Sequence, residues 1–253
     1  MGSLSPFGVN HMTNLKKLDC IKRSGINTNG IKNLNLIKLD IKTNYKIIDV
    51  SHMSNLKELD ISKNYVIKND GIKNINLKIL NMDYHPKITD LNHMTNLKKL
   101  YAYDNNTLTN ESIKNINPKK FTITFNKKIN DLNHMTNLKN LNISCCDMNN
   151  DSLKNLNLKE LICSYNSKIT NVNHMTYLKS LFATDDCGID DEGIKDLNLE
   201  ILSIRNNKKI TKVNHMTNLK YIDSGHQTDF KLNRMTNLKS VDSGHQTDLK
   251  NNN

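Results

Sequence analysis

Hydrophobic residues recur along this chain in a short motif, Leu-x-x-Leu-x-Leu, with a polar residue at the ninth place. Leu36 to Asn44 and Leu56 to Asn64 are two examples. The second and third leucines alternate with variable residues, which is the period-two pattern of a β-strand with one buried face. Each motif therefore predicts one short strand whose leucines point inward and whose variable residues point outward.

The motif returns every 20 to 21 residues, and a longer phrase, Asn92-His-Met-Thr-Asn-Leu-Lys-Lys-Leu100, returns with small changes in every second unit. A fixed period of this length is typical of a solenoid, in which each repeat stacks on its neighbours. The repeats align on twelve positions: Leu15, Leu36, Leu56, Leu77, Leu97, Pro118, Leu138, Leu158, Leu178, Leu199, Leu219 and Leu238.

This series resembles the leucine-rich repeat family over almost the whole chain. The resemblance implies an α/β leucine-rich repeat solenoid, a curved right-handed coil of about twelve repeats. A parallel β-sheet would line its concave face, and 3₁₀ and short helical turns its convex face, because each unit is too short for a long helix. We expect residues 1–8 to be an N-terminal tail or additions to the native start, 9–249 a single repeat domain, and 250–253 a disordered polar tail.

The chain offers no membrane or export signal that we can identify. No apolar run approaches the roughly 20 residues of a membrane span, and the first ten residues lack a lysine-rich start followed by an apolar segment. The five cysteines are an odd number without paired spacing, so we expect reduced thiols. The repeated phrase also resembles uncharacterised Asn- and Lys-rich leucine-rich repeat proteins of giant DNA viruses that infect amoebae, which would place the chain in host cytoplasm.

Six of the nine histidines occupy the same place in alternate repeats, too far apart to share a metal ion. Successive members would lie about 9 to 10 Å apart, whereas two ligands of one zinc lie within about 4 Å. We expect them to bond to the backbone of convex turns. Because phosphate-loop, metalloprotease and Cys-x-x-Cys motifs are also missing from the sequence, we predict no enzyme and no cofactor. The six are His11, His52, His93, His134, His174 and His215.

The chain is basic, with a formal net charge of +11, and a lysine follows the first leucine of most units. Such a lysine stripe along one edge of the sheet could bind nucleic acid or another anionic polymer. Codon bias toward lysine in a solvated face explains it as well, and arginines and stacking aromatics are scarce. The lysine stripe comprises Lys16, Lys57, Lys78, Lys98, Lys119, Lys139, Lys159, Lys179, Lys220 and Lys239.

The outward strand positions are the best candidates for a binding surface, because they vary while the leucines do not. Most are polar, and the first three of the middle column are Asp19, Asp40 and Asp60. Aromatic and isoleucine residues among polar neighbours are typical of a protein-binding hot spot, although they also suit a strand surface. We predict a non-catalytic, monomeric module that binds an unidentified protein on its concave face through Tyr101, Tyr103, Ile162, Phe182, Ile201 and Tyr221.

Overall fold

The computed structural model describes residues 8–22, 24–226, 232 and 235–243 of the chain. The chain forms two compact units, Met1–Leu138 and Lys139–Asn253, called unit 1 and unit 2 below. The predicted segment 250–253 and all but the last residue of the predicted segment 1–8 lie outside the described residues.

Unit 1 is a stack of short coils, each contributing one strand of three or four residues to a parallel sheet. Neighbouring coils in the chain are neighbours in the sheet, and equivalent leucines face each other, as Leu39 faces Leu59. A short helix follows on alternate coils. The elements are β1 (Lys17–Asp19), η1 (Thr28–Ile31), β2 (Lys38–Asp40), β3 (Glu58–Asp60), η2 (Asn69–Ile72), β4 (Ile79–Asn81), β5 (Lys99–Ala102), α1 (Asn110–Ile113) and β6 (Lys120–Ile123).

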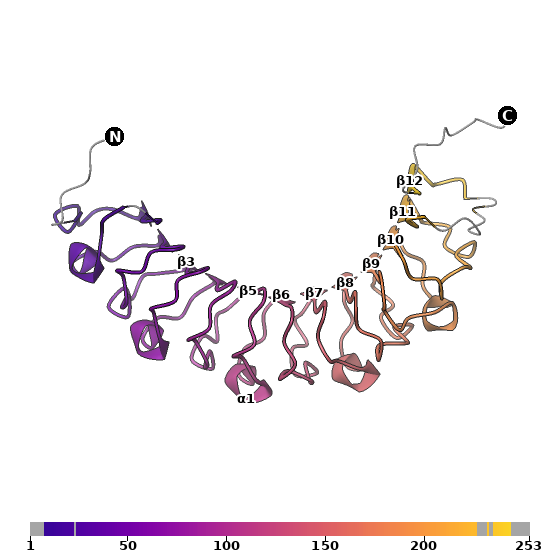
Figure 1. The fold of residues 1–253 in the computed structure, drawn as a ribbon, viewed down its shortest axis with the longest axis horizontal. Helices are drawn as coiled ribbons and strands as arrows, with labels where there is room; N and C mark the ends of the chain where they lie inside the picture. Colours follow the sequence, from indigo (N-terminus) through magenta and orange to yellow (C-terminus); the bar gives the residue numbers. More distant parts are fainter. Residues whose placement is uncertain (1–7, 23, 227–231, 233–234, 244–253) are drawn as a thin grey trace. The chain divides into compact units, whose positions relative to one another are not determined.

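Unit 2 repeats this plan, again with parallel pairing in chain order. In each unit the strands line one side and the short helices lie on the opposite side (Figure 1). Both units therefore have the predicted leucine-rich repeat architecture with 3₁₀ and one-turn helices. The elements are β7 (Asn140–Asn142), η3 (Asn150–Leu153), β8 (Glu160–Ile162), β9 (Ser180–Phe182), η4 (Glu192–Ile194), β10 (Ile201–Ser203), β11 (Tyr221–Asp223) and β12 (Ser240–Asp242).

The interior of each coil is closed by the predicted leucines and by residues of the return segments. Leu77, Leu80 and Met82 of one coil are fully buried, as are Ile72 and Ile88 on either side of them. A reciprocal cap begins α1: the Thr109 hydroxyl accepts the Ser112 N–H, and the Ser112 hydroxyl accepts the Thr109 N–H. The repeat pattern thus specifies both the core and the turns.

Polar residues at the ninth place form a ladder through the interior. Asn44 donates its side-chain amide to Cys20 O at 2.8 Å and Ile26 O at 3.2 Å, and its oxygen accepts two backbone N–H groups. Asn105 and Asn126 make the same kind of contacts to the preceding coil. Such bonds satisfy buried backbone groups between coils, as expected of an asparagine at this place.

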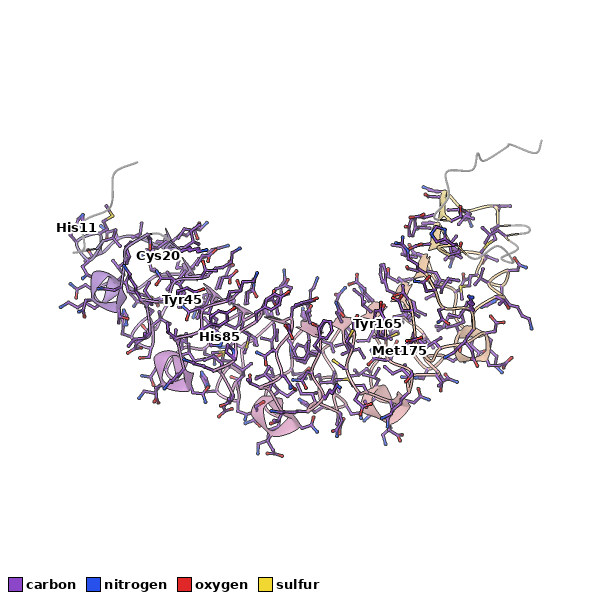
Figure 2. All side chains as sticks on the ribbon, in the orientation of Figure 1. His11, Cys20, Tyr45, His85, Tyr165 and Met175 are labelled. Atoms are coloured by element: carbon purple, nitrogen blue, oxygen red, sulfur yellow. The ribbon has the colours of Figure 1, made fainter. Side chains whose placement is uncertain are left out.

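His85 interrupts this ladder within unit 1 (Figure 2). Its side chain is completely buried, Nδ1 accepts the Lys87 N–H, and Nε2 has no hydrogen-bond partner among the described residues. Burial, together with the nearby Lys87 charge, lowers the pKa of His85 to about 4. His85 is therefore neutral in the folded chain near neutral pH.

Five of the six periodic histidines bond to backbone, as predicted. The Nε2 atoms of His52, His93, His134, His174 and His215 lie 3.1 to 3.3 Å from carbonyl oxygens of the preceding coil. Their structural role is thus the same in both units.

None of the helices within the described ranges is long and apolar enough to cross a membrane.

Candidate functional site

A row of aromatic side chains lies along the strand side of unit 1, where the chain leaves each strand. Five successive coils each contribute one ring, and every ring is exposed, by 37% to 48%. Large exposed side chains on five successive coils need an explanation beyond core packing. The aromatic edge comprises Tyr45, Tyr65, Tyr84, Tyr103 and Phe125.

The rings of the aromatic edge contact one another in two groups, a pair and a group of three. Tyr45 stacks on Tyr65 with centroids 5.9 Å apart, and Tyr103 lies 5.1 Å from Tyr84 and 5.9 Å from Phe125. These separations are within the favourable range for aromatic pairs. The rings therefore hold each other in place at the surface.

A tight turn after each strand aims part of this row outward. Tyr84 and Phe125 adopt left-handed backbone angles, with φ of 57° and 53°, and seven other non-glycine residues do so at the same place in their coils. The Tyr84 N–H still pairs with Tyr103 O of the next coil at 2.8 Å. Left-handed backbone costs bulky residues about 1 kcal/mol or more. The stacking of coils sustains this strained turn.

Four aspartates lie beside the aromatic edge. Asp19, Asp40 and Asp60 are register partners at the ends of β1, β2 and β3, and Asp83 is the second residue after β4. We call these four the acidic patch. Burial raises the pKa of Asp40, and the charges of Asp60 and Asp19 add to this. Burial and the Asp60 charge likewise raise the pKa of Asp83. The carboxylates thus repel one another.

Among the described residues no ion pair holds the acidic patch, although the charge of Lys42 and its N–H bond partly oppose the raised pKa of Asp40. The ion pairs that involve described residues use other acids, namely Glu58, Glu111, Asp147, Glu192, Glu200, Asp223 and Asp242. The chain carries an excess of eleven positive charges, yet none of the described lysines or arginines pairs with these four carboxylates. Such an anionic patch in a basic chain favours a cation from outside.

The fold itself needs an oxygen at these positions but not a charge. Asp40 accepts the Lys42 N–H at 2.9 Å, and this bond closes the turn after β2. Asn81 and Asn142 make the equivalent bonds to Asp83 N and Ser144 N. Because the neutral amide serves the same turn, the charge on Asp40 has no structural role that the neighbouring coils require.

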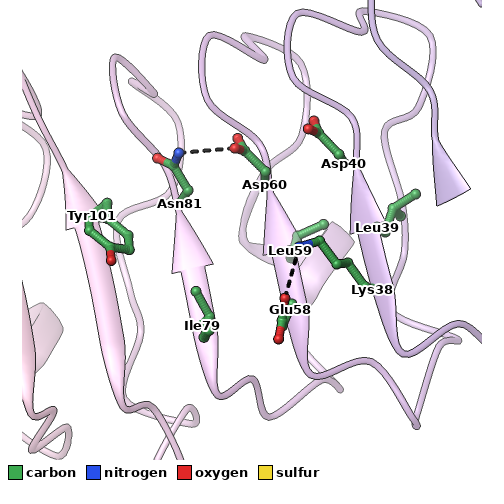
Figure 3. A pocket seen from close by; sticks show the side chains of 9 residues that line it. All are labelled: Lys38, Leu39, Asp40, Glu58, Leu59, Asp60, Ile79, Asn81 and Tyr101. Atoms are coloured by element: carbon green, nitrogen blue, oxygen red, sulfur yellow. Dashed lines mark hydrogen bonds and ion pairs between the residues drawn. The ribbon is translucent and has the colours of Figure 1, made fainter. Parts of the chain in front are cut away.

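A shallow depression of about 220 Å³ lies between the acidic patch and Tyr101 (Figure 3). Carboxylates of Asp40 and Asp60 stand at one end of it, and the Asn81 amide donates to Asp60 at 3.0 Å. Its apolar walls suit an aliphatic stem, and its carboxylates suit a positive head group. The lining residues are Lys38, Leu39, Asp40, Glu58, Leu59, Asp60, Ile79, Asn81 and Tyr101.

Two of the six predicted partner-binding residues belong to unit 1. Tyr101 in β5 is half-buried, and the Lys120 ammonium lies 5.7 Å from its ring centroid. Tyr103 is exposed and belongs to the aromatic edge. Both residues lie next to the acidic patch, since the Tyr103 N–H donates to Asp83 Oδ1 at 2.7 Å.

The other four predicted residues belong to unit 2. Ile162 and Phe182 are register partners on β8 and β9, and Ile201 and Tyr221 are register partners on β10 and β11. All four are half-buried. They form two pairs in different columns, because Phe182 faces Ser203 rather than Ile201. Their role in binding stays a prediction.

The lysine stripe lies at the opposite end of the strands from the aromatic edge. Backbone hydrogen bonds join successive members of the stripe: Lys78 N donates to Lys57 O, and Lys98 N donates to Lys78 O, each at 2.8 Å. Most of its side chains are exposed. Lys179 and Lys220 pair with Glu200 at 3.2 and 2.6 Å. The stripe is thus a basic line that Ile37 interrupts in unit 1 and that Glu200 interrupts and partly neutralises in unit 2.

The cysteines form no disulfide within the described part of the chain. Cys163 and Cys187 have their sulfur atoms 3.6 Å apart and are both buried, and burial raises the pKa of Cys20 to about 12. No group of three metal-ligating side chains occurs among the described residues. Neither the cysteines nor a metal-ligand cluster therefore provides a candidate site within the described part of the chain.

Sequence reasoning missed four members of the aromatic edge, Tyr45, Tyr65, Tyr84 and Phe125. It followed the alternation only through the strand, and these residues lie in the turn that comes after it. A signal was available, because each residue is next to the ninth-place polar residue in its repeat. The acidic residues Asp19, Asp40 and Asp60 were noted, but their missing ion pairs depend on packing between coils.

No protein-family model matches the sequence, and no curated protein matches it. Solved structures do resemble it in fold. An internalin (inlF) from Listeria monocytogenes is 22% identical, with a TM-score of 0.60 over 91% of this chain and 74% of that one. TLR13, in complex with ssRNA13, is 19% identical with a TM-score of 0.60 over 92% of this chain and 40% of its own.

A third structure, the yeast Rad7 and Elc1 complex, is 14% identical with a TM-score of 0.55, covering 90% of this chain and 81% of that one. At these identities the similarity establishes the leucine-rich repeat fold of the chain and nothing about its ligand.

Proposed function

We propose that this chain is a non-catalytic protein-interaction module that binds a partner protein on the strand side of its solenoid. The observation that carries the proposal is the aromatic edge of unit 1, where five successive coils each expose a ring and the rings contact one another in a pair and a group of three. Rigid aromatic groups bury much area at little entropic cost when a partner covers them.

Structures of similar fold support both this function and its alternative. The Rad7 structure was solved with Elc1, a protein, and the TLR13 structure with ssRNA. For this chain the alternative ligand is nucleic acid or another anionic polymer on the lysine stripe. The two surfaces lie at opposite ends of the strands, so variants can separate them.

A nuclease-treated pull-down from cell lysate at moderate salt tests the proposal. We expect the native chain to retain a protein that a Tyr65→Ser plus Tyr103→Ser variant loses, because the variant removes two central rings. Tyr177→Ser is the control, since Tyr177 is 64% exposed and lies in a return segment of unit 2. Circular dichroism of each variant verifies the fold.

The same assay includes a Tyr101→Ser plus Phe182→Ser variant, which tests the residues predicted from sequence. Equal retention by native chain and both double variants would contradict the proposal. Retention that disappears on nuclease treatment and falls steeply with salt would favour the lysine stripe instead.

A further inference from the structure

We propose that the aromatic edge and acidic patch of unit 1 bind an extended, lysine- or arginine-rich segment of the partner protein. This rests on the proposed function, and it adds the chemistry of the ligand. The exposed rings provide the contact area, and the carboxylates beside them favour a positively charged ligand.

The first step is the charge of the surface. Asp19, Asp40, Asp60 and Asp83 stand on four successive coils, and none takes part in an ion pair with a described residue. Asn81 shows that a neutral side chain makes the same turn. The carboxylates repel one another without stabilising the fold, so a cationic ligand would relieve a cost already present in the free chain.

The second step is that one ring of the aromatic edge, Tyr84, and the nearby ring of Tyr101 each have a cation over them. The Lys63 ammonium lies 4.9 Å from the Tyr84 ring centroid, and Lys120 lies 5.7 Å from that of Tyr101. Both distances are within the range of cation–π attraction. Tyr45, Tyr65 and Tyr103 have exposed rings of the same kind, available to basic side chains of a ligand.

The third step is the depression between Asp40, Asp60 and Tyr101 (Figure 3). Ile79 and Tyr101 line it with apolar groups, Lys38 and Glu58 pair with each other at 3.1 Å in its lining, and the carboxylates stand at one end. A lysine or arginine side chain combines an aliphatic stem with a charged head and matches both parts. Phosphate groups would instead meet carboxylates, so this surface disfavours nucleic acid.

The spacing of the coils indicates how basic residues should be arranged. Adjacent strands lie about 4.8 Å apart, so the distance between alternate coils is about 9.6 Å. A polyproline II segment advances about 9.3 Å in three residues. A basic residue at every third position would therefore present one charge to every second coil, so about three such residues would span the aromatic edge.

The experiment measures binding of a fluorescent twelve-residue peptide, four repeats of Lys-Ser-Gly, by anisotropy at low salt. The test variant is Asp19→Asn, Asp40→Asn and Asp83→Asn, which keeps the oxygens that accept Lys42 N and Tyr103 N. Asp60 is left intact because both its oxygens are already bonded.

A matched control removes three charges elsewhere in the same unit. Asp49→Asn, Asp90→Asn and Asp131→Asn change turn aspartates that accept a backbone N–H two residues on, as Asp40 does. They lie in return segments near the short helices, since Val50 N and Leu91 N bond to Gly71 O and Ser112 O. The net charge of the chain becomes more positive by the same amount in the test and the control variant.

We expect the native chain and the control variant to bind the lysine peptide alike, and the test variant about tenfold more weakly, a factor that corresponds to about 1.4 kcal/mol. The same peptide with acetylated lysines should not bind. The inference is overturned if the test variant binds like the control, if the acetylated peptide binds equally, or if the native chain does not bind. Partner retention that still depends on Tyr65 and Tyr103 would then leave the proposed function standing.

Discussion

The two units have the same coil but treat their surface carboxylates differently. In unit 2, Arg205 lies between Asp223 and Asp242 at 3.3 and 3.6 Å. Burial opposes ionisation of Asp185, yet hydrogen bonds from Asn206 and Thr184 outweigh it and lower its pKa. In unit 1, the acidic patch has no such compensation among the described residues, and the pKa values of Asp40 and Asp83 are raised.

The difference in charge compensation between the units is not required for the stability of the fold. The core and the ladder are built by the same rules in both units, so they cannot explain why the acids of unit 1 are left unpaired. Side chains that cost the free chain energy are expected where a ligand repays that cost. Unit 1 therefore has the features of a binding surface, and unit 2 those of a stabilised scaffold.

The largest predicted effect tests the shared core. Leu80→Ala in unit 1 and Leu202→Ala in unit 2 each empty a fully buried strand position. Both should lower the free energy of unfolding by about 2–5 kcal/mol, measured by urea denaturation with circular dichroism. If one of the two variants lost less than about 1 kcal/mol of unfolding free energy, the claim that both units are packed alike would be contradicted.

The next effect concerns His85, which unit 2 lacks at its ladder positions Asn166 and Asn207. Its folded pKa of about 4 lies below the ordinary value of 6.5, so protonation favours the unfolded chain. Stability from this residue is complete above pH 6.5 and declines as pH falls toward 4, by about 2 kcal/mol at pH 5.

His85→Asn should remove that decline, because asparagine does not titrate and can donate to Asn64 O as Asn64 donates to the preceding coil. Thermal unfolding of native and variant chains at pH 5 and 7.5 measures the difference. An equal change in melting temperature for both chains between these pH values would show that His85 does not carry the effect.

A smaller effect tests charge compensation in unit 2. Arg205→Gln leaves Asp223, whose side chain is only 11% exposed, without its ion pair. Half of the Arg205 side chain is in solvent, so the expected loss is modest, about 1 kcal/mol. Urea denaturation at pH 7.5 measures it, and a gain in stability would show that the pair is not needed.

The smallest effect tests the opposite situation in unit 1. Asp40→Asn plus Asp83→Asn keeps both turn bonds and relieves repulsion around Asp60, which should stabilise the chain by about 0.5 kcal/mol. Asp49→Asn plus Asp90→Asn provides the control. A destabilised double variant would mean that the acidic patch supports the fold, and its assignment to binding would fail.

The fold was predictable because twelve in-phase repeats specify strand position, inward face and turn chemistry together. The histidines were also predictable, since a residue fixed at one place in alternate coils must make the same contact each time. The aromatic edge was not found, because the left-handed turn at Tyr84 and Phe125 changes the direction of the side chains after the strand ends.

The charge pattern was beyond sequence reasoning for a different physical reason. Ion pairs such as Lys220 with Glu200 join residues one coil apart, and long side chains choose among several neighbours there. Asp19, Asp40 and Asp60 could be read from the repeat, but whether a lysine reaches them depends on packing. The site prediction was therefore partial in unit 1, where Tyr101 and Tyr103 lie beside the patch, and stays untested in unit 2.

The most direct measurement places a photo-crosslinking benzoylphenylalanine at Tyr84 or at Tyr165. The two residues occupy the same left-handed turn in their coils, one in each unit, and are 37% and 53% exposed. After irradiation in nuclease-treated lysate, position 84 should cross-link to a protein and position 165 should not. Cross-linking from position 165 alone, equal cross-linking from both, or none from either would contradict binding on the aromatic edge of unit 1.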